Sequence, residues 1–147
     1  MTPPPGPATV ADMVAILDSL YPPSLAESWD AVGLVAGDPA ARVERVAFAV
    51  DPTLRAVEDA IAWGAELLVV HHPLLLRPVH SVAATTFKGA IVHRLIRAGC
   101  ALYTAHTNAD AAMDGVADGL GGAIGLVDMR PLVPAEGGRP GEGLGRA

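Results

Sequence analysis

The chain of 147 residues has the length of one domain, and 51 per cent of its residues are apolar, which is typical of a globular protein. Its 16 acidic and 10 basic residues give a net charge of −6, so we expect no binding to a nucleic-acid backbone. No targeting segment and no apolar run as long as a membrane span is visible, which indicates a cytoplasmic protein without membrane contact.

The N-terminal part of the sequence predicts one helix and one short strand. Residues 1–8 are rich in proline and are expected to form a disordered leader. Thr9 is a candidate N-cap for a helix with apolar residues on one face, and the Tyr21-Pro22-Pro23 segment ends that helix. A short strand follows and closes at Gly37.

The next stretch predicts a strand, a helix and a second strand. Residues 45–50 have the pattern of a strand, and Asp51 stands where an N-cap would lie, with Pro52 at the first helical position. Gly64 is the expected C-cap of that helix. Leu67 to Val70 are all apolar without alternation, which is typical of a strand buried on both faces.

The C-terminal half continues the alternation of helices and strands. We expect a helix from Thr86 to Gly99, a strand over residues 101–105 and a weak helix over residues 115–124. This order predicts an α/β fold with a mixed or mostly parallel sheet flanked by helices, in one domain over residues 9–130. Residues 131–147 are expected to be a flexible tail. The single Cys100 is expected to fill a buried position as a small residue.

Two histidines end the strand that is expected to be the most deeply buried. His71 and His72 directly follow Val70, at the carboxyl end of a strand, where open α/β sheets place their sites. Neighbouring side chains on a regular strand point to opposite faces, so both histidines can face one site only if the chain turns, and Pro73 favours such a turn. The alternative is that they are two loop histidines that cap the strand.

A second strand end carries the same kind of chemistry. His106 follows the strand over residues 101–105, and Asp110 comes four residues later. If the two strands are parallel with one crossover helix between them, three imidazoles and a carboxylate lie together at one edge. This mixture of nitrogen and oxygen donors suits zinc, iron, manganese or nickel better than calcium. His80 and His93 stand in polar surroundings and are expected to be solvated.

Other common catalytic signatures are missing from the sequence. It has no Gly-x-Ser-x-Gly elbow, no phosphate-binding loop and no dinucleotide fingerprint. From the local pattern alone, Trp29 and Asp30 are best explained as a tryptophan that anchors a loop beside an aspartate cap. The metal site therefore remains the main functional hypothesis.

Three motifs in this order resemble the dinuclear metal-centre family, whose bacterial members are named GTP cyclohydrolase I type 2 homologues and which includes NGG-interacting-factor-like proteins. The motifs are Glu-Ser-Trp-Asp-Ala-Val-Gly-Leu at residues 27–34, His-His-Pro-Leu at residues 71–74 and His-Thr-Asn-Ala-Asp at residues 106–110. The resemblance implies two adjacent divalent metal ions per complete site.

The resemblance also implies a role for each residue of these motifs. His71 and His72 would each ligate one of the two ions, and Asp110 would ligate one of them. His106 would be the catalytic residue at the edge of the site, either as a loose ligand or as a proton carrier. Trp29 and Asp30 would line the same cavity.

The sequence departs from the family at two places. Ala31 stands where the family usually has asparagine, so a polar contact at that position is lost. The family also continues past the segment at residues 141–146 into a second half that supplies a further histidine and a bridging glutamate, and the present chain resembles the first half.

The function implied by the resemblance is that of a metal-dependent hydrolase. Its substrate would be a small molecule such as a nucleotide whose purine ring is opened. The protein would be a homo-oligomer, a hexameric ring in the family. Two alternatives stay open: a metal-binding scaffold or regulatory partner without turnover, and an inactive half-domain that needs a second chain.

Overall fold

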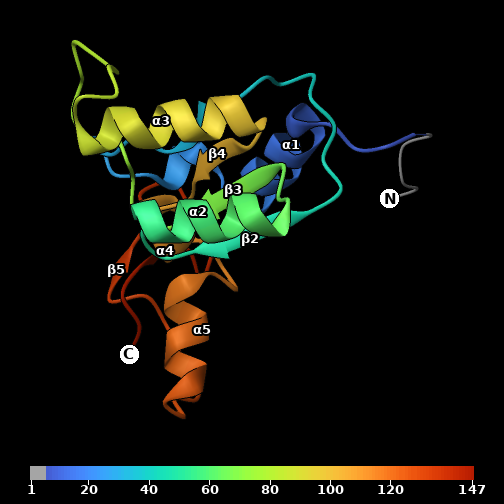
Figure 1. Cartoon of the computed structure of the whole chain (residues 1–147). Coiled ribbons are helices and arrows are strands. Elements are labelled where there is room, and N and C mark those ends of the chain that lie inside the picture. Colours follow the sequence, from blue (N-terminus) through green and yellow to red (C-terminus); the bar gives the residue numbers. More distant parts are fainter. Residues whose placement is uncertain (1–5) are drawn as a thin grey trace.

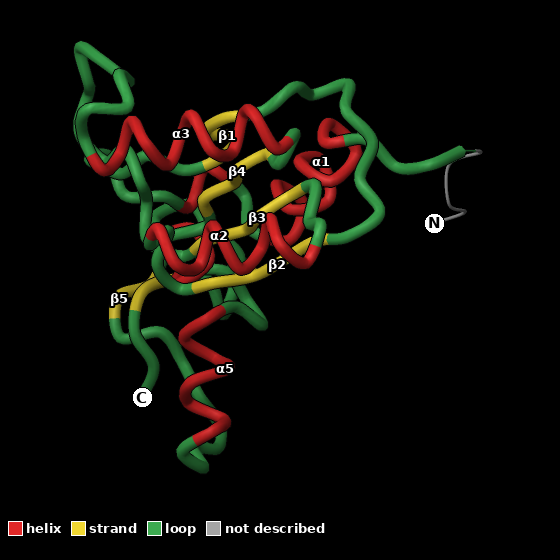
Figure 2. Tube along the Cα trace, in the orientation of Figure 1, coloured by secondary structure: helices red, strands yellow, loops and turns green. Residues whose placement is uncertain are grey.

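The structure is a computed structural model that describes residues 6–147, and residues 1–5 of the expected leader lie outside the described part. It consists of a four-stranded sheet between helices, with a small two-stranded ribbon at the C-terminal end (Figures 1 and 2). The elements are α1 (Val10–Leu20), a short 3₁₀ helix η1 (Pro23–Leu25), β1 (Gly33–Ala36), β2 (Val46–Ala49), α2 (Leu54–Trp63), β3 (Leu67–Val70), α3 (Phe87–Ala98), β4 (Ala101–Thr104), α4 (Thr107–Ala111), α5 (Val116–Ala123), β5 (Val133–Pro134) and β6 (Gly143–Leu144).

The sheet has the strand order β1-β4-β3-β2, in which β2, β3 and β4 run parallel and β1 runs antiparallel to β4. All four residues of β3 and all four of β4 are buried. The expected α/β fold with a mixed, mostly parallel sheet is therefore confirmed. The predicted adjacency of β3 and β4 is confirmed as well, with α3 as the crossover helix between them.

Helices cover both faces of the sheet, and each face has its own core. On one face, α2 and α3 pack over Leu68, Val70 and Leu102 (Figure 1). On the other face, α1 packs through Val10 and Leu17 over side chains of β3 and β4. Successive residues of β3 thus point into two different cores, which explains why the strand is apolar without alternation.

The helix boundaries follow from their caps, with one correction to the sequence analysis. Thr9 caps α1 in a capping box with Asp12, and Gly64 ends α2 in the left-handed conformation, as expected. The predicted N-cap of α2 is wrong: Thr53, not Asp51, accepts a hydrogen bond from the amide of Ala56, at 3.1 Å. Asp51 and Thr53 are both good caps, and the carboxylate of Asp51 is engaged elsewhere.

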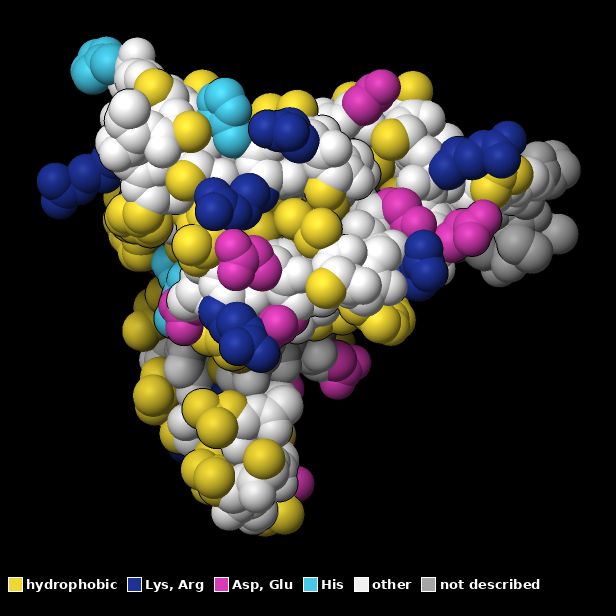
Figure 3. Space-filling model, in the orientation of Figure 1, with side chains coloured by type: hydrophobic (Ala, Val, Ile, Leu, Met, Phe, Trp, Pro, Cys, Tyr) yellow, Lys and Arg dark blue, Asp and Glu magenta, His cyan; other side chains and the backbone are white. Residues whose placement is uncertain are grey.

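Residues 131–147, treated above as a tail, contain the antiparallel pair β5–β6. Arg146 attaches this ribbon to the body, since its guanidinium contacts the Asp118 carboxylate and donates to the carbonyl of Ala112 at 3.1 Å. Helix α5 projects from the body (Figure 1). In the space-filling view its surface shows hydrophobic side chains and few charges, whereas charges of both signs stand on α2 and α3 (Figure 3). None of the helices in residues 6–147 has the length and apolar character of a membrane span.

Candidate metal centre

One edge of the sheet gathers the polar residues of the site. His71 and His72 follow β3, His106 follows β4, and Asp51 lies just beyond β2, so the carboxyl ends of three parallel strands contribute. Asp30 joins them from the other direction, because β1 is antiparallel to β4 and Gly33 pairs with Thr104. The topology alone therefore brings five ligand-type side chains to one edge.

His71 is oriented by the backbone. Its Nδ1 lies 3.0 Å from the carbonyl oxygen of Ala105. A carbonyl oxygen can only accept a hydrogen bond, so Nδ1 carries a proton, and in the neutral ring the lone pair is on Nε2. The Nε2 atom lies 3.7 Å from Oδ1 of Asp110, which the first turn of α4 places there. With Nδ1 held by the backbone, Nε2 is the nitrogen of His71 that can ligate a metal.

His72 and His106 are each oriented by a carboxylate instead. Nδ1 of His72 lies 2.7 Å from Oδ1 of Asp51, and Nδ1 of His106 lies 2.9 Å from Oδ1 of Asp30. In both pairs the imidazole donates through Nδ1, which leaves Nε2 as the nitrogen available to a ligand. All three histidines therefore have Nδ1 engaged.

The three histidines converge. One ligand atom from each of His71, His72 and His106 can be chosen so that all lie within 4.8 Å of one another. The ring centroids are 5.1 Å apart for His71 with either neighbour and 5.8 Å apart for His72 with His106. Donor atoms around a tetrahedral zinc ion lie about 3.3 Å apart, so modest side-chain rotations bring these nitrogens to a common ion. The donor set fits a divalent metal.

Asp30 is the best-connected group of the site. Its side chain is fully buried, and besides His106 it accepts hydrogen bonds from the amide of Ala31 at 2.7 Å, the amide of Thr107 at 3.0 Å and the Thr107 hydroxyl. Burial raises the pKa of this carboxyl, but the hydrogen bonds from Thr107, His106 and the two backbone amides outweigh burial, so the pKa lies below its ordinary value. Asp30 is therefore ionised at neutral pH.

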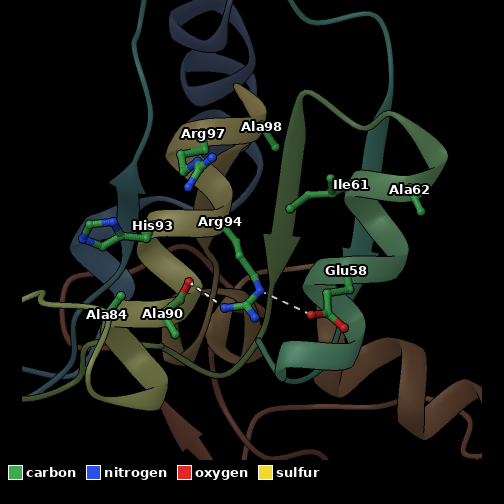
Figure 4. Close-up of a pocket in the computed structure, with 9 residues that line it drawn as sticks. All are labelled: Glu58, Ile61, Ala62, Ala84, Ala90, His93, Arg94, Arg97 and Ala98. Carbon is green, nitrogen blue, oxygen red and sulfur yellow. Dashed lines mark hydrogen bonds and ion pairs between the residues drawn. The ribbon is translucent and has the colours of Figure 1, made fainter.

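The remaining histidines and the cysteine lie outside this cluster. His93 belongs to α3 and lines a hollow of about 660 Å³ between α2 and α3, which the Arg94–Glu58 ion pair bridges at 3.3 Å (Figure 4). His80 is exposed in the loop before α3, as expected. Cys100 is buried, and burial together with the charge of Glu66 raises the pKa of its thiol to about 11, so the cysteine packs as a neutral side chain.

Sequence reasoning missed the role of Asp51. The sequence pattern favours a helix cap for this residue, although it lies two positions past the end of β2, just as His72 lies two positions past the end of β3. The rule that parallel strands end at one edge would have placed it beside the histidines. The hydrogen bond between Asp30 and His106 joins residues 76 positions apart, and no local sequence pattern predicts it.

Comparison with known proteins agrees with the resemblance found in the three motifs. The family model described as Duf34/NIF3 (NGG1p interacting factor 3) matches residues 8–147. The protein named GTP cyclohydrolase 1 type 2 homolog of Streptomyces coelicolor is 53% identical over 138 residues, which are 93% of this chain and 48% of that protein. Its namesake in Mycobacterium tuberculosis is 55% identical over 128 residues, 87% of this chain and 33% of that protein.

Solved structures show the same fold. A Bacillus cereus protein related to NIF3 superposes with a TM-score of 0.84 at 33% identity, over 90% of this chain and 36% of that chain. A Staphylococcus aureus hypothetical protein superposes with a TM-score of 0.82 at 38% identity, over 86% of this chain and 42% of that chain. The present chain thus spans between a third and a half of the length of these relatives.

Proposed function

The chain belongs to the Duf34/NIF3 family, and on that premise we propose that the edge of its sheet binds divalent metal ions and serves a metal-dependent hydrolase that acts on a nucleotide-like substrate. The observation that carries this proposal is the convergence of three imidazoles, each with Nδ1 held by a neighbouring oxygen, which leaves Nε2 of each ring as the nitrogen available to an ion or a proton. The nucleotide-like substrate is suggested by the name of the bacterial relatives.

In this proposal His71, His72 and Asp110 hold the metal. The Ala105 carbonyl holds Nδ1 of His71 and the Asp51 carboxylate holds Nδ1 of His72, so each ring offers Nε2 to the ion. Asp110 supplies the carboxylate, with Oδ1 3.7 Å from Nε2 of His71. Two nitrogen donors and one oxygen donor suit zinc, iron, manganese or nickel.

His106 is proposed to move the proton. A bound divalent ion supplies an acidic water and polarises the group to be attacked. The buried carboxylate of Asp30 holds Nδ1 of His106, directs Nε2 toward the cluster and stabilises the imidazole when it takes up a proton. This pairing makes His106 the best placed general base or acid of the site.

A metal-binding scaffold without turnover is the second candidate, and the charge of the site favours it. Two divalent ions bring four positive charges, whereas the proposed ligands offer one negative charge, from Asp110. The chain spans at most about half of its relatives' length, so a complete site could draw on a further segment or a partner chain. The described residues alone then hold metal without completing the catalyst.

Calorimetric titration with zinc and manganese tests the metal proposal. His71→Ala, His72→Ala and Asp110→Ala should each weaken binding at least tenfold, because each removes a bond to the ion that no neighbour replaces. His106→Ala should have a smaller effect on affinity if His106 carries a proton rather than the ion. Binding should weaken in acid, since a protonated imidazole cannot ligate.

His80→Ala and His93→Ala are the matched controls, because both residues are histidines outside the cluster. Their affinities should equal that of the parent protein, and a loss as large as that of His72→Ala would place the metal site elsewhere. Release of product from GTP by the metal-loaded protein separates the two candidates. Tight metal binding without turnover of GTP would refute the hydrolase proposal and favour the metal-binding scaffold.

A further inference from the structure

A large aromatic side chain stands exposed beside the histidine cluster. Trp29 is 57% exposed, while the side chain of Asp30, the next residue, is fully buried. The indole meets the imidazole of His106 edge-on, with ring centroids 6.1 Å apart and an interplanar angle of 79°. More than half of an apolar side chain is thus left in water at the rim of a polar site, where its burial would be favourable.

The position of Trp29 is fixed although its side chain is open. The amide of Asp30 donates to the carbonyl of Glu27 at 2.9 Å, which closes a turn around the tryptophan. The amide of Glu27 donates to the Thr107 hydroxyl at 3.0 Å, and the Asp30 carboxylate accepts from Thr107 as well. The loop is therefore attached on both sides of Trp29 to the segment that begins at His106.

This arrangement differs from that of a tryptophan that anchors a loop. An anchor is buried, whereas here the aspartate anchors the loop and the indole faces the solvent. A preformed aromatic surface next to polar groups is the usual platform for a flat ring, since stacking needs only a π-face. A ring that rests on Trp29 would lie beside His106, the histidine that the indole contacts.

We infer that Trp29 is the stacking platform for a planar heteroaromatic ring of the substrate, of purine size, whose edge it presents to His106. The inference rests on the proposed function, because it makes Trp29 the residue that selects the substrate of that same site. Stacking on an aromatic side chain changes affinity by about tenfold or more. Loss of the indole should therefore weaken binding of the ring and leave metal binding intact, because no proposed metal ligand is removed.

The chain offers a clean reporter, because it has two tryptophans, Trp29 and Trp63. In a Trp63→Phe background, fluorescence excited at the red edge of the indole band comes from Trp29 alone. The zinc-loaded protein is titrated with guanosine 5′-monophosphate and, as the matched control, with ribose 5-phosphate, which has the same sugar and phosphate without the base. We expect saturable quenching by the nucleotide and none by the sugar phosphate.

Equilibrium dialysis of the same nucleotide with Trp29→Ala and Trp29→Phe completes the test. Trp29→Ala should bind at least tenfold more weakly, and Trp29→Phe should retain most of the affinity because a phenyl ring still stacks. Circular dichroism checks that both variants fold. Quenching of equal size by ribose 5-phosphate, or parental nucleotide affinity in Trp29→Ala, would overturn the inference.

Zinc titration of the same variants keeps this inference apart from the metal proposal. Trp29→Ala with parental zinc affinity and weakened nucleotide binding supports both. A parent protein that binds no zinc but still shows base-dependent quenching refutes the metal site and leaves the platform standing. A parent protein that binds zinc but shows no base-dependent quenching refutes the stacking platform and leaves the metal site standing.

Discussion

Replacing Asp30 by asparagine tests whether the site and the fold depend on the same buried carboxylate. The carboxylate accepts four hydrogen bonds: Ala31 and His106 donate to Oδ1, and the amide and hydroxyl of Thr107 donate to Oδ2. Asparagine has the same shape but only one acceptor oxygen. If that oxygen takes the Oδ1 position, the new amide group opposes the Thr107 amide. If it takes the Oδ2 position, it opposes the Ala31 amide.

Either orientation leaves one backbone N–H, of Ala31 or of Thr107, without an acceptor beside this buried side chain, which costs about 1–3 kcal/mol. The bonds that remain also lose the contribution of the charge, roughly another 1 kcal/mol. We therefore expect Asp30→Asn to lower the free energy of unfolding by about 3 kcal/mol. For a protein of this size that corresponds to a fall in Tm of about 6–12 °C.

Urea denaturation of the parent and the variant at several pH values measures this effect and its sign. The pKa of Asp30 is lower in the folded state than in the unfolded state, where it is about 3.9. The stability that the ionised carboxylate contributes is therefore complete above the unfolded pKa and is lost as the pH falls through the folded pKa. The difference in free energy of unfolding between the parent and Asp30→Asn should thus be largest at neutral pH and should become smaller below about pH 4.

Asp51→Asn is the matched control, because Asp51 also accepts from a histidine Nδ1 but its side chain is 59% exposed. Its effect on the free energy of unfolding should stay within about 1 kcal/mol. An Asp30→Asn variant that is as stable as Asp51→Asn, or a gap that does not change with pH, would refute the account of Asp30.

Three further predictions concern the core and two helix glycines. Chelator-treated protein should keep its α/β circular dichroism, because both core clusters are built from apolar residues other than the histidines, and collapse to random coil would make the metal structural. Gly89→Ala should destabilise the protein by about 1–3 kcal/mol, since a Cβ would lie 1.9 Å from the Ala83 carbonyl oxygen. Gly119→Ala, where a Cβ meets nothing within 4 Å, should instead stabilise α5 by up to about 1 kcal/mol in thermal unfolding.

The sheet could be predicted from the sequence because its signals are local. The unbroken apolar run of β3 and the glycines that end α2 and α3 each mark an element within a few residues. The single crossover helix then fixes β3 and β4 as parallel neighbours, and with them the adjacency of His71 and His106.

Helix α4 could not be predicted in the same way. Its five residues, Thr107–Ala111, contain three polar side chains, a composition that also fits a turn. Buried Asn108 accepts from the amide of His106 at 2.9 Å and donates to the carbonyl of Tyr21 at 2.7 Å, 87 positions away. Contacts of that range decide the conformation here, and they have no signature in the local sequence.

The order of the strands also ranks the site residues by exposure. Across β1, β4, β3 and β2, the exposed fraction of the side chain rises from 0% at Asp30 through 16% at His106, 21% at His71 and 50% at His72 to 59% at Asp51. A carboxylate–imidazole pair therefore stands at each end of the row, one in the interior and one in solvent. The hydrogen bond between Asp30 and His106 is the stronger of the two, because burial shields it from water. This asymmetry is the physical reason for proposing proton transfer by His106 and metal binding by His72. It is also why we expect the loss of the Asp30 carboxylate to lower the free energy of unfolding more than the loss of the Asp51 carboxylate.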